Sequence, residues 1–193
     1  NEGELHSYLI GITAGIFREA DDLGDGELID RIKDSAKQKG TGRWASLEAL
    51  KQGVDISMIT SACTARIMSN HLDEREKAWQ LIHSPAVGLS PDKESFAAMV
   101  REALYTGKII AYAQGFSLMQ DASRLYGWNL DLGKIASIFR AGCIIQAVFL
   151  NDITHAFEAE PKPENLIFDG FFLSRINEHQ DSLRQAVSTG VMN

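Results

Sequence analysis

Cysteine is scarce in this 193-residue chain, and its two cysteines carry no sign of a disulfide or a metal site. Cys63 and Cys143 lie far apart in apolar segments, without a further cysteine or histidine at metal-ligand spacing. The five histidines form no HxxxH or HExxH pair, the usual spacing of a helical zinc site. We therefore expect two buried free thiols and no metal ion.

Positive charge and long apolar runs are scarce as well. Lys and Arg number 19 against 26 Asp and Glu, and the resulting net charge of −7 argues against a nucleic-acid partner. No apolar run approaches the roughly 20 residues that span a membrane, and the first residues lack the basic and apolar regions of a signal peptide. We expect a cytoplasmic globular protein with no membrane partner, whose 45% hydrophobic residues build a core.

Strand patterns are absent, because period-two alternation never persists, and the four prolines are confined to two connecting stretches. Apolar residues instead recur at three- and four-residue steps, which indicates helices. Gly53 and Gly127 are expected to end helices, whereas Asp55 and the pair Ser90-Pro91 are expected to begin them. We predict a single all-α domain over residues 1–193. The expected helices span residues 4–20, 27–37, 43–52, 55–69 and 71–83, a long stretch from Ser90-Pro91 to Gly127, and residues 132–158.

The expected helix over residues 132–158 is most apolar between Gly142 and Leu150 and lacks a wide polar face. Such a pattern predicts burial in the core or in a subunit interface. Arg140 lies at the edge of this stretch, and a buried arginine is costly unless it is paired. We expect it to pair with an acidic residue on a neighbouring helix rather than with a ligand.

A duplicated helical unit is predicted by short patterns that recur at a similar offset, with chance agreement between amphipathic helices as the alternative. If the repeat is real, the second copy breaks off inside the unit. The recurring patterns are Leu9-x-x-Ile12-Thr13 with Leu150-x-x-Ile153-Thr154, Asp34-Ser35-x-Lys37-Gln38 with Asp181-Ser182-x-Arg184-Gln185, and Thr41-Gly42 with Thr189-Gly190.

The stretch Gln38-Lys39-Gly40-Thr41-Gly42-Arg43-Trp44 places a cation and two glycines just before an expected helix. Glycines let the backbone approach a ligand, and the N–H groups and positive dipole end of the helix favour an anion. Arg66 is the natural second cation, because it lies on the helix that follows the short one, and a turn at Gly53 lets these two helices run antiparallel. Lys39, Thr41 and Arg66 together form a candidate clamp for a phosphate or carboxylate. The alternative is a structural loop with solvated charges.

Other polar residues give no clear sign of catalysis. Tyr112 and Gln114, on the long helix, have groups that can bind a ligand, and a satisfied polar pair in the core explains them equally well. The sequence contains no G-x-S-x-G motif, no nucleophile beside a base, and no dinucleotide-binding glycine motif after a strand. From its residues alone, the chain is an all-α domain for anion binding or oligomerisation.

Several strings resemble the C-terminal helical domain of decarboxylating 6-phosphogluconate dehydrogenase, in colinear order over nearly the whole chain. They are long and unusual, so the resemblance is specific. The strings are Lys39-Gly40-Thr41-Gly42-Arg43-Trp44, Tyr112-Ala113-Gln114-Gly115-Phe116, Phe139-Arg140-Ala141-Gly142-Cys143-Ile144-Ile145 followed by Val148-Phe149-Leu150, and the closing residues from Gln180 to Val191.

The resemblance implies an enzyme of the pentose phosphate pathway. Such an enzyme oxidises 6-phosphogluconate with NADP and then loses carbon dioxide to give ribulose 5-phosphate. The resemblance also implies a homodimer whose all-α domains make the main interface. By the same resemblance, Lys39 and Arg66 would hold the substrate phosphate, with Thr41 beside them.

The family also has parts that this chain lacks: a Rossmann domain, a segment with the catalytic lysine and glutamate, and a C-terminal tail that reaches the partner's active site. Together with the missing initiator methionine, this predicts an excised domain that neither oxidises nor decarboxylates the substrate alone. One alternative is a non-catalytic helical dimerisation module with weak phosphosugar binding. Another is a related β-hydroxyacid dehydrogenase with a non-phosphorylated substrate.

Overall fold

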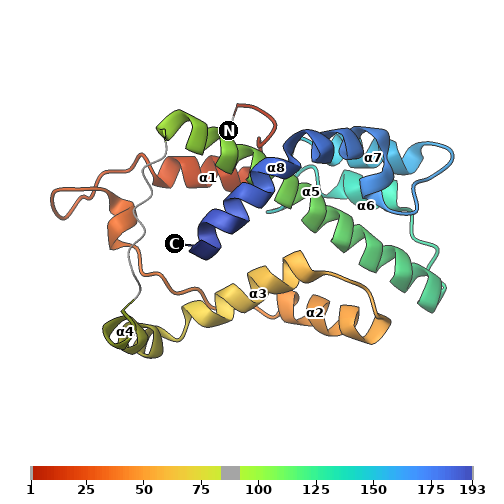
Figure 1. Ribbon diagram of the computed structural model, residues 1–193. Coiled ribbons are helices and arrows are strands. Elements are labelled where there is room, and N and C mark those ends of the chain that lie inside the picture. Colours follow the sequence, from red (N-terminus) through yellow and green to blue (C-terminus); the bar gives the residue numbers. More distant parts are fainter. Residues whose placement is uncertain (1, 84–91, 193) are drawn as a thin grey trace.

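The computed structural model describes residues 2–83 and 92–192, which form helices and loops without a β-strand (Figure 1). The expected all-α class is therefore confirmed. No helix in these two ranges is long and apolar enough to cross a membrane. The α-helices are α1 (Tyr8–Ile16), α2 (Thr41–Gln52), α3 (Ser57–Ser69), α4 (Leu72–Leu81), α5 (Lys93–Tyr126), α6 (Leu132–Ile138), α7 (Leu150–Glu158) and α8 (Gly170–Met192), and the 3-10 helices are η1 (Leu28–Arg31) and η2 (Leu166–Phe168).

The longest element is α5, with 34 residues and a length of about 50 Å. The side chain of Asp92 caps its first turn by accepting a hydrogen bond from the N–H of Ser95. Gly127 ends it in the left-handed conformation, at φ 67°. The prediction of one long helix that ends at Gly127 is confirmed, whereas its predicted start at Ser90-Pro91 lies outside the described residues.

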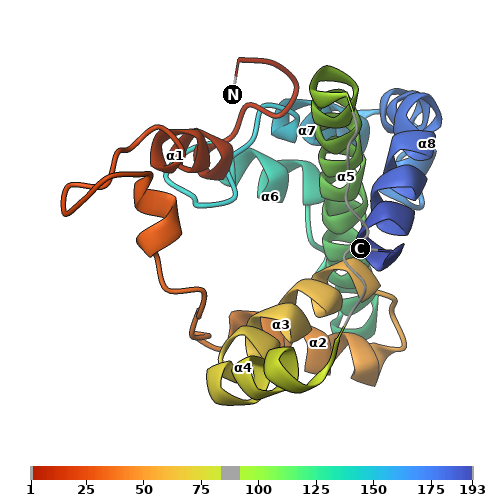
Figure 2. The ribbon, with the colours of Figure 1, turned by 60° about the vertical axis from the view of Figure 1, so that its left-hand side comes forward.

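The hydrophobic core forms around α5. Figure 2 shows α6 and α7 on one side of α5 and α8 on another, and α2 and α3 lie beside its C-terminal part. Ile109, Phe149, Leu150 and Phe172 are almost completely buried there, and the Phe149 ring meets that of Tyr112 edge to face with centroids 4.9 Å apart. Burial of one such side chain stabilises the fold by about 1.5–3 kcal/mol.

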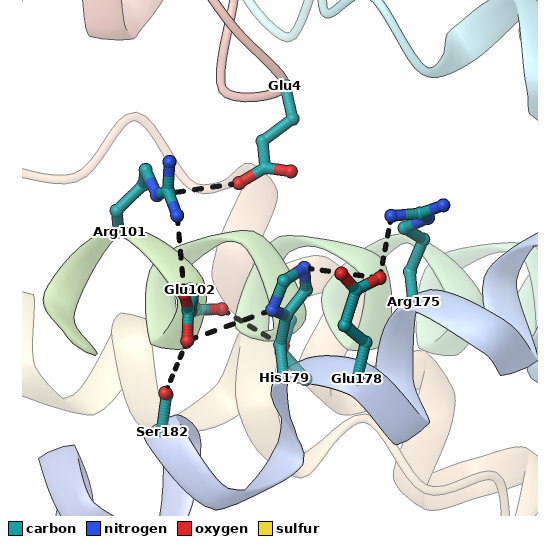
Figure 3. Close-up of polar contacts among 8 residues, drawn as sticks. Glu4, Arg101, Glu102, Arg175, Glu178, His179 and Ser182 are labelled. Atoms are coloured by element: carbon teal, nitrogen blue, oxygen red, sulfur yellow. Dashed lines mark hydrogen bonds and ion pairs between the residues drawn. The ribbon is translucent and has the colours of Figure 1, made fainter. Parts of the chain in front are cut away.

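Polar side chains join α5 to α8 beside this core (Figure 3). Ser182 Oγ donates a 2.6 Å hydrogen bond to Glu102, and Nδ1 of the buried His179 lies 3.8 Å from the same carboxylate. Arg101 lies 3.2 Å from Glu102 and 3.7 Å from Glu4 of the N-terminal segment. The hydrogen bond from Ser182 outweighs desolvation and lowers the pKa of Glu102. The cluster therefore fastens α8 and the N-terminal segment to α5.

Two helices expected near the N-terminus are shorter than predicted. The helix expected over residues 4–20 is α1, and the helix expected over residues 27–37 is only η1. The buried carboxylate of Asp21 binds Arg31 at 2.8 Å and thereby closes a tight loop. The residues that follow run beside α3, where the N–H of Ala36 binds a side chain of that helix, instead of continuing as a helix.

The prediction of a single helix over residues 132–158 is wrong, because the chain forms α6 and α7 with a loop between them. Gly142 in this loop has a φ of 65°, a left-handed conformation that interrupts a helix. The backbones of residues 6–8 and 146–148 then pair through two hydrogen bonds of 3.2 and 3.0 Å. The carbonyl of Gln146 and the N–H of Val148 therefore form tertiary hydrogen bonds that a continuous helix would break.

Predicted burial is confirmed only in part. Phe149 is buried, as predicted for a core position. Ile144 is 62% exposed, so the core does not bury it, and its burial in a subunit interface stays a prediction. Cys63 and Cys143 are free thiols, as expected, but both are only partly buried. Ile144 and Cys143 are exposed or partly exposed because both lie in the loop between α6 and α7 and not in a packed helix.

The predicted internal repeat stays a prediction, and its first pair of patterns lies in two helices of equal length. α1 and α7 have nine residues each, and in both a threonine hydroxyl donates to the carbonyl of the leucine four residues earlier. These bonds are 2.8 Å long in α1, from Thr13, and 2.9 Å long in α7, from Thr154. Residues 34–38, however, are not helical, whereas residues 181–185 lie within α8. The second pair of patterns therefore has no common structure.

Candidate anion-binding site

The expected antiparallel pair of helices is formed by α2 and α3. Gly53 turns the chain after α2 in the left-handed conformation, at φ 70°. The hydroxyls of Ser46 and Thr60 lie 3.4 Å apart across the pair. Nearer the start of α2, a Cβ atom on Gly42 would lie 3.3 Å from Sγ of Cys63. The start of α2 therefore lies against the second half of α3.

Gly40 forms the turn that leads into α2. Its φ of 107° falls in a region that residues with a side chain rarely adopt. Thr41 is the first residue of α2, and this helix start has neither a side-chain cap nor an acidic residue in its first turn. The uncapped N–H groups and the positive end of the helix dipole favour an anion at this point.

The loop that precedes α2 lies against α3, the helix that carries Arg66. The N–H of Ala36 donates to Ser69 Oγ at 3.1 Å, and six residues later Gly42 packs on α3. Between these contacts, Oε1 of Gln38, the residue before Lys39, lies 3.7 Å from Sγ of Cys63. The chain segments that carry Lys39 and Arg66 therefore pack against each other beside the start of α2.

Lys39, Thr41 and Arg66 all have exposed side chains. Within residues 2–83 and 92–192, neither Lys39 nor Arg66 forms an ion pair, whereas Arg31 and Arg75 bind carboxylates at 2.8 and 2.6 Å. The three predicted residues thus lie on neighbouring segments of the chain, and neither cation has an acidic partner in the described ranges. The same geometry suits a phosphate or a carboxylate.

Gln114 and Tyr112 of α5 have structural contacts. The side chain of Gln114 accepts from the N–H of Met58 at 3.0 Å and donates to Asp55 at 3.0 Å, so it anchors the start of α3 to α5. The hydroxyl of Tyr112 donates to the carbonyl of Ile145, and burial raises the pKa of Tyr112 to about 12. Gln114 therefore supports the site indirectly, because it fixes the helix that carries the second cation.

The predicted ion pair of Arg140 is wrong, since no carboxylate of the described residues binds it. Its guanidinium donates to Asn151 at 2.9 Å and to the carbonyl of Ser137 at 3.3 Å. Arg140 lies in the exposed loop after α6, where water solvates the charge and no acidic partner is required. It lines a hollow of about 550 Å³ beside α1 rather than beside α2 and α3.

The fold defines a class of protein, an all-helical domain, and the start of α2 with Lys39 and Arg66 is its candidate site for a phosphate or carboxylate group. In the part of the chain that the structure describes, no group of three His, Cys, Asp or Glu side chains could hold a metal ion.

Comparison with known proteins identifies the family. A family model described as "6-phosphogluconate dehydrogenase, C-terminal domain" matches residues 1–193, and the chain belongs to this family. Relatives named "6-phosphogluconate dehydrogenase, decarboxylating" are 46% identical over 191 residues in Lactococcus lactis, 46% over 192 in Mus musculus and 44% over 193 in Staphylococcus aureus. These alignments cover 99%, 99% and 100% of this chain. The resemblance seen in the sequence is therefore confirmed.

A solved structure shows the same fold. The 6-phosphogluconate dehydrogenase of Plasmodium falciparum matches 99% of this chain with a TM-score of 0.93 and 40% sequence identity. That protein is described in its apo form, with its cofactor NADP+ and with its substrate 6-phosphogluconate. The chain spans only 41% of that protein and 40% of the Lactococcus lactis relative.

Proposed function

We propose that this chain is the helical domain of a decarboxylating 6-phosphogluconate dehydrogenase, in which Lys39, Thr41 and Arg66 hold the phosphate of the substrate. The whole enzyme would oxidise 6-phosphogluconate with NADP and release carbon dioxide to give ribulose 5-phosphate. The observation that supports the clamp most directly is that the loop carrying Lys39 packs on the helix carrying Arg66, beside the uncapped start of α2, and that neither cation has an acidic partner in the described residues.

The three residues supply different kinds of contact. The planar guanidinium of Arg66 is suited to two phosphate oxygens at once, and the ammonium of Lys39 is a mobile point charge. The hydroxyl of Thr41 and the start of α2 add hydrogen-bond donors. A phosphate monoester carries about −1.5 to −2 charges at pH 7, which two cations and a helix N-terminus balance.

The clamp would hold the end of the substrate that does not react. In this proposal, NADP and the groups that remove the hydride and the carboxylate belong to parts of the enzyme outside these 193 residues. The domain alone then has no activity, and its task is to fix the position of the sugar acid. Reduction of NADP by the 193-residue chain with 6-phosphogluconate would contradict this division.

We also propose that the domain forms a homodimer. Apolar side chains are exposed along the last turns of α8, where Val187, Val191 and Met192 are 59%, 79% and 70% exposed. Together with Leu183 they line an apolar hollow. A contiguous apolar patch on a protein surface commonly marks an interface.

The affinity of the full-length protein for 6-phosphogluconate and for gluconate tests the proposed substrate. These compounds differ only in the phosphate, so 6-phosphogluconate should bind at least about tenfold more tightly, the factor expected from one charge-assisted contact. Equal affinities would contradict the phosphate clamp and favour a dehydrogenase for non-phosphorylated acids. Tight binding without NADP reduction by the full-length protein would favour a non-catalytic module.

A further inference from the structure

Two neighbouring side chains at the end of α3 bind both the backbone of Arg66 and the loop that leads to Lys39. Nδ2 of Asn70 donates to the carbonyl of Arg66 at 3.0 Å and to the carbonyl of Ala36 at 2.9 Å. The hydroxyl of Ser69 donates to the carbonyl of Arg66 at 2.7 Å and accepts from the N–H of Ala36 at 3.1 Å. Two side chains thus bridge the same pair of backbone positions.

These bridges connect the chain segments of the two cations. Arg66 is itself one of the bridged residues, and the other, Ala36, precedes Lys39 by three residues. We propose that Ser69 and Asn70 are positioning residues that set the spacing between Lys39 and Arg66, an inference that rests on the proposed phosphate clamp.

Few other contacts of the described residues hold the loop here, and one of them is the weak 3.7 Å hydrogen bond from Sγ of Cys63 to Oε1 of Gln38. Residues 35–39 form no helix or strand, so their position depends on contacts with other elements. Ser35 Oγ donates to Asn70 Oδ1 at 3.0 Å, and Arg75 binds Asp34 at 2.6 Å. Asn70 therefore holds the loop through both ends of its amide.

A simple helix cap does not account for this arrangement. Water or any nearby donor can satisfy the last carbonyls of an exposed helix. Here the same side chains also form hydrogen bonds with the N–H and the carbonyl of Ala36, so the end of the helix and the loop are held in a fixed relative position. A fixed spacing matters for a bidentate anion site, because a misplaced cation loses hydrogen-bond geometry with the phosphate.

Steady-state kinetics of the full-length enzyme test the proposal with Asn70→Asp, Asn70→Ala and Ser69→Ala. Asn70→Asp keeps the shape but replaces the donor with an oxygen that repels both carbonyls. We expect the KM for 6-phosphogluconate to rise about tenfold in the Asn70 variants and about threefold in Ser69→Ala, the factors that correspond to lost hydrogen bonds. The kcat and the KM for NADP should stay within about twofold of the parent values.

Asn165→Ala is the matched control. This asparagine also donates to another element, at 3.2 Å to Ser117, but it lies at η2 and not at the clamp. It should lower the melting temperature without a change in the KM for 6-phosphogluconate. A double-mutant cycle adds a second readout: in an Arg66→Ala background, Asn70→Ala should raise KM by about twofold or less, because the spacing no longer matters.

The outcomes separate the inference from the function on which it rests. If Arg66→Ala leaves the KM unchanged, the clamp is wrong and the inference falls with it. If Arg66→Ala raises the KM but Asn70→Asp and Ser69→Ala do not, the clamp stands and the positioning role is overturned. If Asn70→Ala raises the KM for 6-phosphogluconate by the same factor with and without Arg66, the positioning role is also overturned. A merely structural role of Asn70 predicts that equal factor. Where an Asn70 variant does not fold, Ser69→Ala decides.

Discussion

At the scale of single residues, the candidate site depends on charges without a partner in the protein. Lys39 and Arg66 are exposed and unpaired in the described residues, whereas Arg31 and Arg75 bind carboxylates. An exposed arginine without a partner contributes little to stability. Its removal should therefore change ligand binding and leave folding almost intact.

Arg66→Ala should weaken substrate binding in the full-length enzyme. Loss of a charge-assisted hydrogen bond costs roughly 1.5–3 kcal/mol, which corresponds to a rise in KM of about tenfold or more. Arg184→Ala removes the same charge from the exposed surface of α8 and serves as the control, with an unchanged KM. A KM for 6-phosphogluconate that is unaffected by Arg66→Ala would contradict the role assigned to this residue.

The cations of the candidate site could be named from the sequence, and the residues proposed to position them could not. Lys39 and Thr41 lie beside glycines at the start of an expected helix. Arg66 lies on the next helix, which runs antiparallel to the first and therefore returns towards its start. The bonds of Ser69 and Asn70 join α3 to a loop without regular structure. No periodic pattern encodes such a contact, because it depends on how the loop lies in three dimensions.

At the scale of elements, the start of α2 depends on the left-handed conformation of Gly40. Gly40→Ala places a side chain at φ 107° and should cost about 1–3 kcal/mol. Gly107→Ala is the matched control, because this glycine lies within α5, where an added Cβ meets only Met58 at 3.9 Å. It should be neutral or stabilise by up to about 1 kcal/mol. Chemical denaturation of both variants measures the difference, and equal stabilities would refute the argument.

The contact of α8 with α5 should depend on pH through Glu102. Its folded-state pKa lies below its usual value of 4.5, so its stabilising effect is complete above that pH and is lost as the pH falls through the lowered pKa. Ser182→Ala removes the main cause and should reduce the free energy of unfolding at pH 7 by about 1 kcal/mol. The difference from the parent should shrink below pH 4.5, whereas a difference independent of pH would contradict this account.

Elements with strong local signals were predictable, and breaks caused by tertiary contacts were not. α5 has a continuous apolar period and ends at Gly127, and both are visible in the sequence. The break between α6 and α7 combines Gly142 at positive φ with pairing between residues 146–148 and 6–8. The apolar residues of that loop resemble a buried helix in sequence, because a short apolar run does not show by itself whether the chain is helical there or whether its side chains are buried.

At the scale of the whole molecule, the apolar end of α8 is expected to lie in a dimer interface. The pair of substitutions Val187→Asp and Val191→Asp places charges on this surface and should convert a dimer of the full-length protein into monomers. Leu23→Asp, at a loop residue that is 92% exposed, should leave the dimer intact. Analytical ultracentrifugation distinguishes these results, and an unchanged dimer in the double variant would place the interface elsewhere.

The most direct test of the proposed function is a structure of the full-length protein with 6-phosphogluconate bound. We predict that phosphate oxygens lie about 3 Å from both Nζ of Lys39 and the guanidinium of Arg66, beside the start of α2. A phosphate bound elsewhere, with both cations in contact only with solvent, would contradict the central claim.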